Sequence, residues 1–444
     1  MPYRPVSGHP AELSATEAAA LIRNGSLTSE ALVSACLDQI AATDQEIKAW
    51  EHILPEKALR DAQDCDRAIA SGEETGPLCG VPVGIKDIID VAGYPTEHGS
   101  PIFTGHRPSR DARLVERLRA AGAVILGKTV TTEIAFLHPA KTRNPHDLMR
   151  TPGGSSSGSA AAVAAYQVPL SLGSQTNGSV IRPAAFCGVY GFKPTRGSIP
   201  VDGVLQTSKT LDQVGCFARS VEDVALVASV LSGQNMGWHG SPRLETTPKL
   251  AYLDMPFADR LSDDAKAQFD ALVAALGSSC KRMPAPRFIS TVINAQRSVH
   301  LYEINLHLGD RLRRNPELVS STLKPLLSEG EAISDADYHA ALAALSEAAP
   351  EFENLFSDVD AVISPSTTGT APLASSGTGD PIFCTAWTAA GMPALTLPLL
   401  TGADGLPLGV QLAAPAGRDR HLLHLAQQLT DLLDQPNIRI GNFY

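Results

Sequence analysis

A stretch rich in small residues, 151–195, constrains the fold of this chain more than any other feature. Glycines and serines near its start permit close backbone approach and positive φ angles, which larger side chains resist. The stretch continues into alanines at 160–165 and an apolar run at 169–172, which a flexible linker would not contain. It therefore predicts a serine-bearing loop, a tightly packed helix, a buried strand and a second small-residue turn at 173–179.

Short apolar runs alternate with helical segments from Gly80 onwards, which is typical of the α/β class, a sheet covered by helices. The runs expected to be strands are 81–85, 123–126, 169–172, 250–253 and 361–364. Residues 1–70 are expected to form N-terminal helices, with Thr28 as a cap. Residues 255–350 are charged and helical, so we expect a helical insertion within a single domain of residues 1–444.

Lys86 follows one of these apolar runs, and a lysine at the end of a buried strand is poorly hydrated. Burial disfavours the ammonium form and leaves a neutral amine that can accept a proton. Ser155 and Ser179 lie in the two small-residue loops, where a serine could act as a nucleophile beside backbone amides. The residues alone allow a Lys86 base with serine partners, and they also allow a structural ion pair between Lys86 and Asp87.

Two motifs suggest other chemistries, but their contexts do not fit. Residues 122–129 match the phosphate-loop pattern G-x-x-x-x-G-K-[ST], which requires a strand before its first glycine. Its variable positions Ala-Val-Ile-Leu are themselves strand-like, so nucleotide binding is not expected. Residues 154–158 match the nucleophile elbow G-x-S-x-G, which needs a strand before it. Proline and glycine precede the motif here and indicate a loop, which argues against an α/β-hydrolase site.

Histidines and cysteines give no metal or disulfide signature. His300, Glu303 and His307 have helical spacing, but no H-E-x-x-H pair accompanies them, so we interpret them as a pocket-lining or solvated polar face. His421 and His424 stand at the start of an amphipathic helix and receive the same interpretation. The seven cysteines are an odd number without C-x-x-C pairs, which is typical of reduced packing residues.

Charge and hydropathy argue against two classes of partner. Lys and Arg total 36 against 47 for Asp and Glu, a formal charge of −11, and no basic tract offers a surface for nucleic acid. No run approaches the roughly 20 apolar residues that a membrane span needs. The first residues show no signal-peptide pattern, so we expect a cytoplasmic protein.

Several blocks of the sequence resemble the amidase signature family of serine hydrolases, and the resemblance covers nearly the whole chain. In chain order, the blocks are 80–87, 144–145, 152–156, 178–183, 191–195, 364–367, 391–394 and 405–412. The first looks like the lysine strand of the family, the next two like its first serine loop, and the following two like its nucleophile block. Ser155 and Ser179 lie 24 residues apart, which is also the spacing in the family.

The resemblance implies roles for three side chains. Ser179 is implied to be the nucleophile and Lys86 the ultimate base, acting through Ser155, which in the family follows a cis peptide bond. The oxyanion hole of the family matches the backbone amides of Thr176, Asn177, Gly178 and Ser179. The acyl pocket of relatives matches Ala135, Phe136 and Leu137. No metal and no cofactor are implied.

The chain departs from the family pattern beside these residues. Gln175 replaces an acidic residue, which removes a negative charge near the nucleophile and leaves Arg182 without that possible partner. Asn177 replaces a glycine and adds a side chain beside the oxyanion hole, while Ser157 stands where a glycine is common. None of these changes removes a backbone donor, so we expect activity to survive.

The resemblance also implies an α/β/α architecture around a mixed, mostly parallel sheet. Members of the family cleave amides, and some cleave esters or carbamates, through a covalent acyl-enzyme. Phe136 and Leu137, joined by Leu301 and Ile304 from the insertion, favour a small apolar or aryl substrate. We therefore expect an amidase, with esterase or urethanase activity also open, that works as a monomer or homodimer without nucleic acid or membrane.

Two other functions remain open. The family includes the glutaminase subunit of a tRNA-dependent amidotransferase, which passes ammonia to a partner, and the shared motifs do not exclude it. A non-catalytic binding protein on the same fold is expected to lack Lys86, Ser155 or Ser179, whereas this chain has all three.

Overall fold

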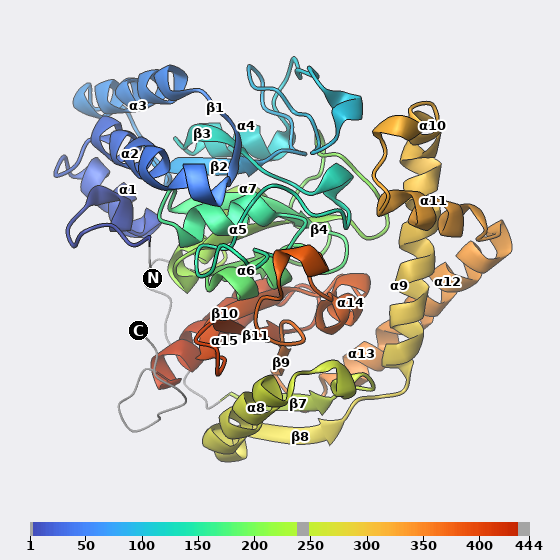
Figure 1. Cartoon of the computed structure of the whole chain (residues 1–444). Helices are drawn as coiled ribbons and strands as arrows, with labels where there is room; N and C mark the ends of the chain where they lie inside the picture. Colours follow the sequence, from blue (N-terminus) through green and yellow to red (C-terminus); the bar gives the residue numbers. More distant parts are fainter. Residues whose placement is uncertain (1–2, 238–247, 434–444) are drawn as a thin grey trace.

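The computed structural model describes residues 3–237 and 248–433. Within these residues, eleven strands form one sheet in the order β1-β3-β2-β4-β6-β5-β10-β11-β9-β7-β8. The strands are β1 (Trp50–Ile53), β2 (Pro82–Lys86), β3 (Val124–Thr129), β4 (Leu170–Gln175), β5 (Tyr190–Lys193), β6 (Gln213–Ala218), β7 (Leu250–Asp254), β8 (Cys280–Pro284), β9 (Ala361–Pro365), β10 (Ala394–Thr401) and β11 (Pro407–Ala413). The sheet runs through the middle of the molecule (Figure 1).

Helices lie on both faces of this sheet. Those in the described ranges are α1 (Ala15–Arg23), α2 (Ser29–Ile47), α3 (Pro55–Ala70), α4 (Arg113–Ala120), α5 (Ser157–Ala164), α6 (Ile181–Cys187), α7 (Val221–Ser232), α8 (Asp263–Leu276), α9 (Phe288–Ile304), α10 (Asp310–Arg313), α11 (Leu323–Glu331), α12 (Asp335–Glu347), α13 (Ala349–Leu355), α14 (Ile382–Ala389) and α15 (Asp419–Leu433). Helices α4, α7 and α15 share one hydrophobic core, and α2, α3, α5 and α6 share another. The predicted α/β fold with a mixed sheet between helices is confirmed.

The sheet is not mostly parallel, however, which corrects the prediction. Of the ten neighbouring pairs among the described strands, four are parallel and six are antiparallel. Parallel neighbours need a long crossover, which α4 supplies between β2 and β3 and α8 between β7 and β8. The short link between β10 and β11 instead makes them antiparallel. Apolar runs predict strands but not their directions.

The five predicted strands are all present, and three details of the local predictions can be compared. Thr28 caps α2, because its side chain accepts a hydrogen bond from the backbone N–H of Ala31. Residues 124–126 of the phosphate-loop match belong to β3, as expected. The small-residue turn expected at 173–179 begins later than predicted, since β4 continues to Gln175.

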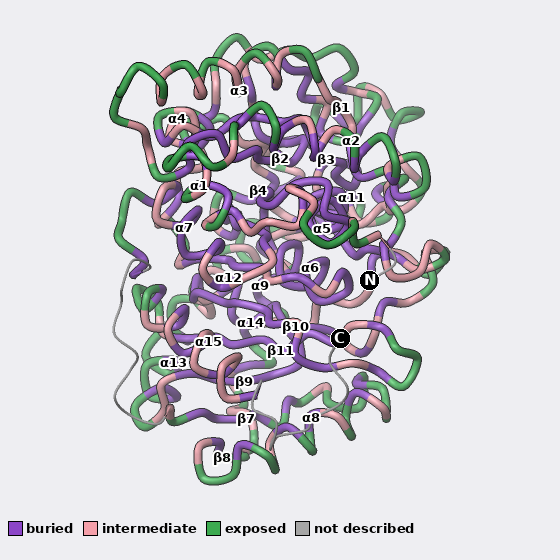
Figure 2. The backbone as a smooth tube through the Cα atoms, turned by 90° about the vertical axis from the view of Figure 1, so that its left-hand side faces the viewer, coloured by how far each residue is buried: buried purple, intermediate pink, exposed green. Residues whose placement is uncertain are grey.

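Close packing explains the small residues at the start of α5. Every residue of α5 is buried, and a Cβ at Gly158 would collide with the backbone of Ala49 and Val130. Figure 2 shows the burial of the strands and of the helices next to them. All seven cysteines are free thiols and six of them are buried, which confirms that they are reduced packing residues.

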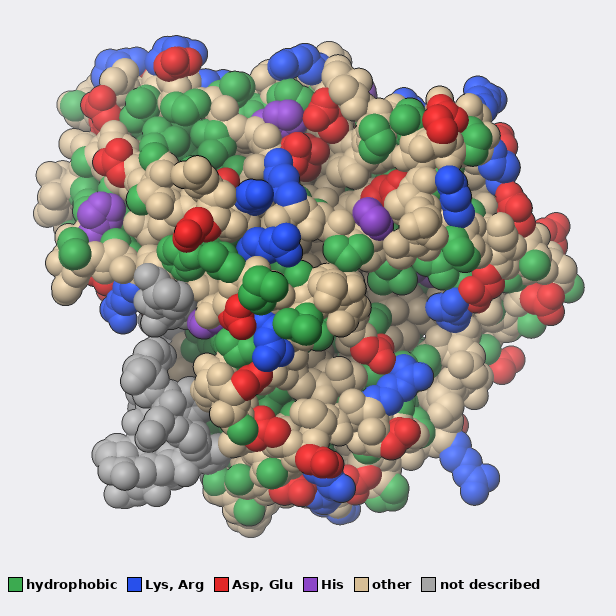
Figure 3. Space-filling model, in the orientation of Figure 1, with side chains coloured by type: hydrophobic (Ala, Val, Ile, Leu, Met, Phe, Trp, Pro, Cys, Tyr) green, Lys and Arg blue, Asp and Glu red, His purple; other side chains and the backbone are tan. Residues whose placement is uncertain are grey.

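The two helical regions each also contribute one edge of the sheet. Residues 1–70 hold α1 to α3 together with strand β1, and residues 255–350 hold α8 to α12 together with strand β8. On the face drawn in Figure 3, acidic and basic side chains are interspersed without a large basic area. Among the described helices, none combines the length and the apolar composition that crossing a membrane requires.

Candidate active site

Lys86 is the last residue of β2, and its side chain is completely buried. Its Nζ lies 2.7 Å from Ser155 Oγ and 2.8 Å from Ser174 Oγ. Burial lowers the pKa of Lys86 well below its ordinary value, and the negative charge of Asp212 opposes that shift. The ion pair between Lys86 and Asp87 that the sequence left open is wrong, because Asp87 pairs with another lysine.

Ser155 lies in the loop that leads into α5. The Gly154–Ser155 peptide bond is cis, as the resemblance implies. Two hydrogen bonds hold this part of the loop: the Thr132 N–H donates to the Ser155 carbonyl at 3.1 Å, and the Arg182 guanidinium donates to the Gly154 carbonyl at 2.8 Å. The loop therefore presents the Ser155 hydroxyl to Lys86 from a completely buried position.

Ser179 follows β4 in the segment that leads into α6, and the side chain of Gln175 organises this segment. Its Oε1 accepts hydrogen bonds from the N–H groups of Val180 and Ile181, at 2.7 and 3.0 Å. Its amide nitrogen donates to Thr388 Oγ1 at 2.8 Å. Gln175 therefore ties the turn to α14 through both ends of its amide.

As expected from Gln175, Arg182 has no carboxylate partner among the residues that the structure describes. Its guanidinium donates to the backbone carbonyls of Gly154 and Gly379. Carbonyl dipoles therefore take the place of a carboxylate partner, and they connect α6 with the loop that carries Ser155.

In the backbone of residues 176–179, the carbonyls of Thr176, Asn177 and Gly178 accept hydrogen bonds, and the N–H groups are free. Gln296 donates to the Thr176 carbonyl at 3.1 Å, and Thr388 Oγ1 donates to the Asn177 carbonyl at 2.5 Å. Within the part of the chain that the structure describes, no acceptor lies within hydrogen-bond distance of the four N–H groups. Gly178 is required here because a Cβ would lie 2.8 Å from Pro381 Cβ. Four free donors in a row can bind a developing oxyanion.

A cleft of about 380 Å³ opens beside these donors. The predicted site residues on its wall are Ala135, Phe136, Leu137, Thr176, Asn177, Ser179 and Leu301. Ile304 is not on the wall, contrary to expectation; it is fully buried in the cluster that packs α9 against the segment around Phe136. The cleft thus joins the predicted acyl pocket, from the 135–137 segment and α9, to the segment that carries Ser179.

Two of the arginines at the cleft pair with carboxylates, whereas Arg182 donates to backbone carbonyls. Arg260 pairs with Asp380 at 2.8 Å, and Arg297 pairs with Glu329 at 2.6 Å. Asn177, which adds a side chain as expected, accepts a hydrogen bond at Oδ1 from Thr385 Oγ1 at 2.7 Å. Two of the three arginines on the wall are therefore paired with carboxylates, and apolar side chains cover much of the wall.

Sequence reasoning missed Ser174, Asp212 and Gln296 as parts of the site. Ser174 stood inside the predicted turn, and its place next to the end of a strand was a signal that could have been used. Asp212 and Gln296 belong to a loop and a helix whose patterns gave no indication of contact with Thr176.

The histidine and the glutamate of α9 both contact other side chains of the protein. His300 lines the cleft and stacks edge-on against Phe136, with ring centroids 4.8 Å apart. Burial lowers the pKa of His300 to about 4, so the ring is neutral at pH 7. Glu303 is buried away from the cleft wall and accepts hydrogen bonds from Ser208, Thr210 and Tyr338, so the pocket-lining interpretation holds for His300 but not for Glu303.

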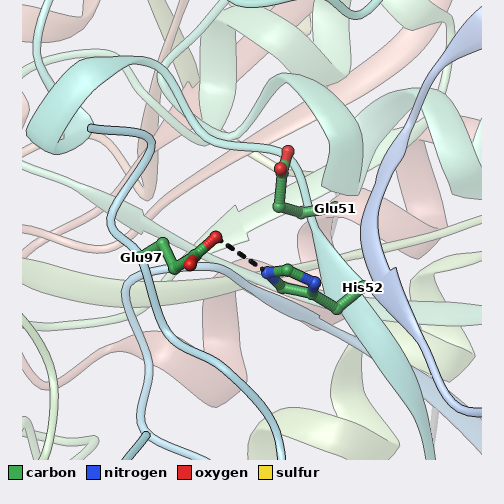
Figure 4. A group of neighbouring side chains, drawn as sticks. All are labelled: Glu51, His52 and Glu97. Atoms are coloured by element: carbon green, nitrogen blue, oxygen red, sulfur yellow. Dashed lines mark hydrogen bonds and ion pairs between the residues drawn. The ribbon is translucent and has the colours of Figure 1, made fainter. Parts of the chain in front are cut away.

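One other group of side chains has the composition of a metal site. Ligand atoms of Glu51, His52 and Glu97 lie within 4.8 Å of one another (Figure 4). Each already has a partner: Glu51 pairs with Lys141 at 2.9 Å, and His52 Nε2 lies 3.1 Å from Glu97 Oε2. The group is fully explained as a partly exposed ion-pair cluster.

Comparisons with known proteins agree with this geometry. The family model described as Amidase matches residues 31–277 and 303–423. A glutamyl-tRNA(Gln) amidotransferase subunit from a Synechococcus strain is 32% identical, over 89% of this chain and 92% of its own length. The structure of the native peptide amidase from Stenotrophomonas maltophilia is similar with a TM-score of 0.81 and 29% identity, covering 95% of this chain and 97% of that one.

A second similar structure comes from a protein complex described as vestigial and as revealing the evolutionary origins of an s-triazine catabolic enzyme. It has a TM-score of 0.87 and 30% identity, over 94% of this chain and 98% of that chain. The chain belongs to the amidase family, the amidase signature enzymes that its sequence blocks resemble. It is accordingly an enzyme of the kind that acts on carbon–nitrogen amide bonds.

Proposed function

We propose that this chain is a stand-alone serine amidase that hydrolyses small apolar or aryl amides, and also aryl esters and carbamates. The observation that carries the proposal is the environment of Lys86: a completely buried amine whose two hydrogen-bond partners are serine hydroxyls. Such a lysine is neutral at a pH where an exposed lysine is charged, so it can serve as a base. We further propose a cytoplasmic monomer or homodimer, folded as a single domain.

In the proposed mechanism, Ser179 Oγ attacks the substrate carbonyl carbon. Its proton passes to Ser155 Oγ while the Ser155 proton passes to the neutral Lys86 amine, so Lys86 becomes an ammonium as the carbonyl oxygen becomes an oxyanion. The free N–H groups of residues 176–179 bind that oxyanion. When the carbon–nitrogen bond breaks, the proton returns through Ser155 to the leaving nitrogen. Water then resolves the acyl-enzyme by the same relay.

The cleft supports an apolar or aryl acyl group. Phe136, Leu137 and Leu301 lie on its wall, joined by Ile293 and Ile382, while two arginines at the cleft, Arg260 and Arg297, pair with carboxylates. A pocket with apolar walls and a few oriented polar groups selects small organic ligands by shape. In this proposal, α9 from the 255–350 segment forms one wall of the substrate site.

The second candidate is a glutaminase subunit of a tRNA-dependent amidotransferase. The similarity to the amidotransferase subunit over most of both chains favours it. A glutamine pocket must bind an ammonium and a carboxylate group, and here Arg260 and Asp380 already bind each other. We therefore rank this candidate below the stand-alone amidase.

The proposal is tested by a panel assay of the purified chain on a p-nitroanilide, an aryl ester, an aryl carbamate and glutamine. We expect turnover of at least one aryl substrate, and loss of that turnover in Ser179→Ala and Ser155→Ala. Ser157→Ala is the matched control, because it removes a buried hydroxyl whose contact with the Val130 carbonyl is long, at 3.4 Å. Turnover of glutamine alone, or turnover that survives in Ser179→Ala, would contradict the proposal.

A further inference from the structure

Asp212 is a partly buried carboxylate beside Lys86 without a cationic partner in contact. It lies directly before β6 and accepts hydrogen bonds from Thr176 Oγ1 at 2.5 Å, Thr207 N at 2.7 Å and Ser208 N at 3.0 Å. Within residues 3–237 and 248–433, no Lys, Arg or His forms an ion pair with it. Removing a carboxylate from water without such a partner costs free energy. A positive charge elsewhere in the site would offset part of this cost.

Ser174 connects the surroundings of Asp212 with Lys86. A cavity of about 10 Å³ has Ser174, Thr176, Thr207 and Asp212 in its lining, which is room for about one water molecule. Ser174 Oγ lies 2.8 Å from Lys86 Nζ on the other side. Lys86 and Asp212 are thus connected through Ser174, which contacts Lys86 and lines the small cavity that Asp212 also lines. In this low-dielectric region their attraction is much stronger than it is in water.

One hydrogen bond of Asp212 connects it to residues 176–179, the segment whose free N–H groups are proposed to bind the oxyanion. Thr176 is the first residue of the 176–179 segment, and its hydroxyl donates to Asp212. Its carbonyl accepts a hydrogen bond from Gln296 on α9. Thr176 is therefore held at two points, by Asp212 through its hydroxyl and by Gln296 through its carbonyl.

We propose that Asp212 is a positioning residue that serves both halves of the site, as the counter-charge of the ammonium that forms on Lys86 and as the anchor of Thr176. This inference rests on the proposed function, because it takes Lys86 as the base. Acylation separates a positive charge on Lys86 from a negative charge on the substrate oxygen. Asp212 stabilises the first through space and orients the donors that bind the second, and it gains or loses no proton in the step.

Other titratable groups surround this pair and enter any pH dependence. They are Asp87 with Lys128, His300 and Glu303 on α9, and Lys193 on β5. Burial lowers the pKa of Lys193 to about 7, so this lysine titrates in the range of interest. Apart from Glu303 in the Glu303→Gln variant, these groups are the same in every protein compared below. Their effects on the pH dependence therefore cancel when the profiles are compared.

The test is the rate at which a fluorophosphonate labels Ser179, measured against pH in the wild type, Asp212→Asn and Glu303→Gln. Labelling forms the bond from Ser179 Oγ to phosphorus and releases fluoride, and the serine proton goes to Lys86. The probe needs no amide substrate. Asparagine can keep Oδ1 toward the N–H groups of Thr207 and Ser208, while the Thr176 hydroxyl rotates to accept from its NH₂ group.

Glu303→Gln is the matched control. It also converts a buried carboxylate to an amide, and Glu303 binds the same loop through Ser208 and Thr210. It does not contact Thr176. Thermal melting of each variant shows whether it is folded.

In Asp212→Asn we expect a lower plateau and a midpoint about one pH unit lower than in the wild type, a tenfold change in proton binding. The midpoint falls because the Lys86 ammonium loses its counter-charge. Burial raises the pKa of Asp212 to about 6, so the wild-type profile should approach that of the variant below this pH. Glu303→Gln should keep the wild-type midpoint.

An unchanged midpoint in Asp212→Asn, or equal shifts in both variants, would overturn the inference. If Asp212→Asn does not fold, Asp212→Glu is measured in its place. This variant retains the negative charge, so the midpoint should stay at the wild-type pH while the plateau falls. A shifted midpoint in Asp212→Glu would also overturn the inference. Absence of Ser179 labelling in the folded wild type would instead count against the proposed function.

Discussion

Strands β2 and β3 are neighbours in the sheet, and each carries a completely buried lysine at its carboxyl end, yet the two lysines have opposite surroundings. Lys128 pairs with Asp87 at 2.9 Å and also donates to Thr96 Oγ1 and the Pro95 carbonyl. Lys86 has two serine hydroxyls as partners. The comparison teaches that the partners of a buried lysine, and not burial itself, decide whether it is a structural cation or a base.

The arrangement follows from the geometry of a strand. Consecutive side chains of a strand point to opposite faces of the sheet, so Asp87 points away from Lys86 although it is next to it in sequence. Parallel pairing aligns Ile85 with Lys128, which places Lys128 on the face toward which Asp87 points. Burial lowers the pKa of Lys128 too, but the charge of Asp87 and its hydrogen bond oppose that shift.

The largest expected effect separates the two lysines by activity. Lys86→Met should lower the acylation rate about 10⁴-fold, because it removes the base and no other group replaces it. Methionine has a similar volume and no charge, so the variant should stay folded. The measurement is single-turnover hydrolysis of an aryl substrate found in the panel assay. Activity within tenfold of the wild type would make Lys86 a structural residue like Lys128.

The reverse substitution should separate the lysines by stability. Lys128→Met leaves the Asp87 carboxylate buried without its cation and should cost about 3–5 kcal/mol in the free energy of unfolding. Urea denaturation measures this loss, and the folded fraction should keep wild-type activity per molecule. The double variant with Asp87→Asn should recover about 1 kcal/mol or more, since the uncompensated charge is gone. If Lys128→Met unfolds at the same urea concentration as the wild type, Lys128 does not stabilise the fold, and the proposed difference between the two lysines is wrong.

The pH dependence of stability sharpens the same contrast. The pKa of Lys86 is lowered in the folded chain, so at pH values between its folded and unfolded pKa the unfolded chain binds more protons. Wild-type stability should therefore rise with pH in this window relative to Lys86→Met, by up to about 1.4 kcal/mol per pH unit. Urea midpoints of both proteins across mildly acidic to alkaline pH test this. A constant difference would mean that Lys86 is not desolvated.

The smallest expected effect concerns the second hydroxyl beside Lys86. Ser174→Ala removes one hydrogen bond to the ammonium that forms during acylation and should lower the rate about tenfold. Ser171→Ala is the control, because it removes another buried hydroxyl from the same strand, one that donates to the Ser159 carbonyl at 2.7 Å. Equal acylation rates for the two variants would mean that the hydrogen bond from Ser174 to Lys86 does not contribute to the rate, and that of the two hydroxyls beside Lys86 only Ser155 does.

Much of the site could be predicted because its residues lie in strong local patterns. Lys86 ends a five-residue apolar strand and Ser155 and Ser179 lie in loops of small residues, so local sequence made them candidates, and the resemblance to the family supplied their roles. The acyl-pocket residues came from resemblance, and the structure brings Phe136 and Leu137 to the cleft with Ser179. Ile304 was misplaced because helical spacing does not tell which side of a helix faces a cavity and which faces another helix.

By itself, the sequence determined the positions of the strands and the burial of Lys86, because these depend on composition and periodicity within a few residues, and its motif blocks identified the family by resemblance. The tertiary structure alone decided which groups meet. Ser174 is 88 residues from Lys86, and Gln296 is 120 residues from Thr176. Strand direction, the pairing of Asp87 with Lys128 and the place of Asp212 depend on such long-range contacts. They arise when the whole sheet assembles, and no local pattern encodes them.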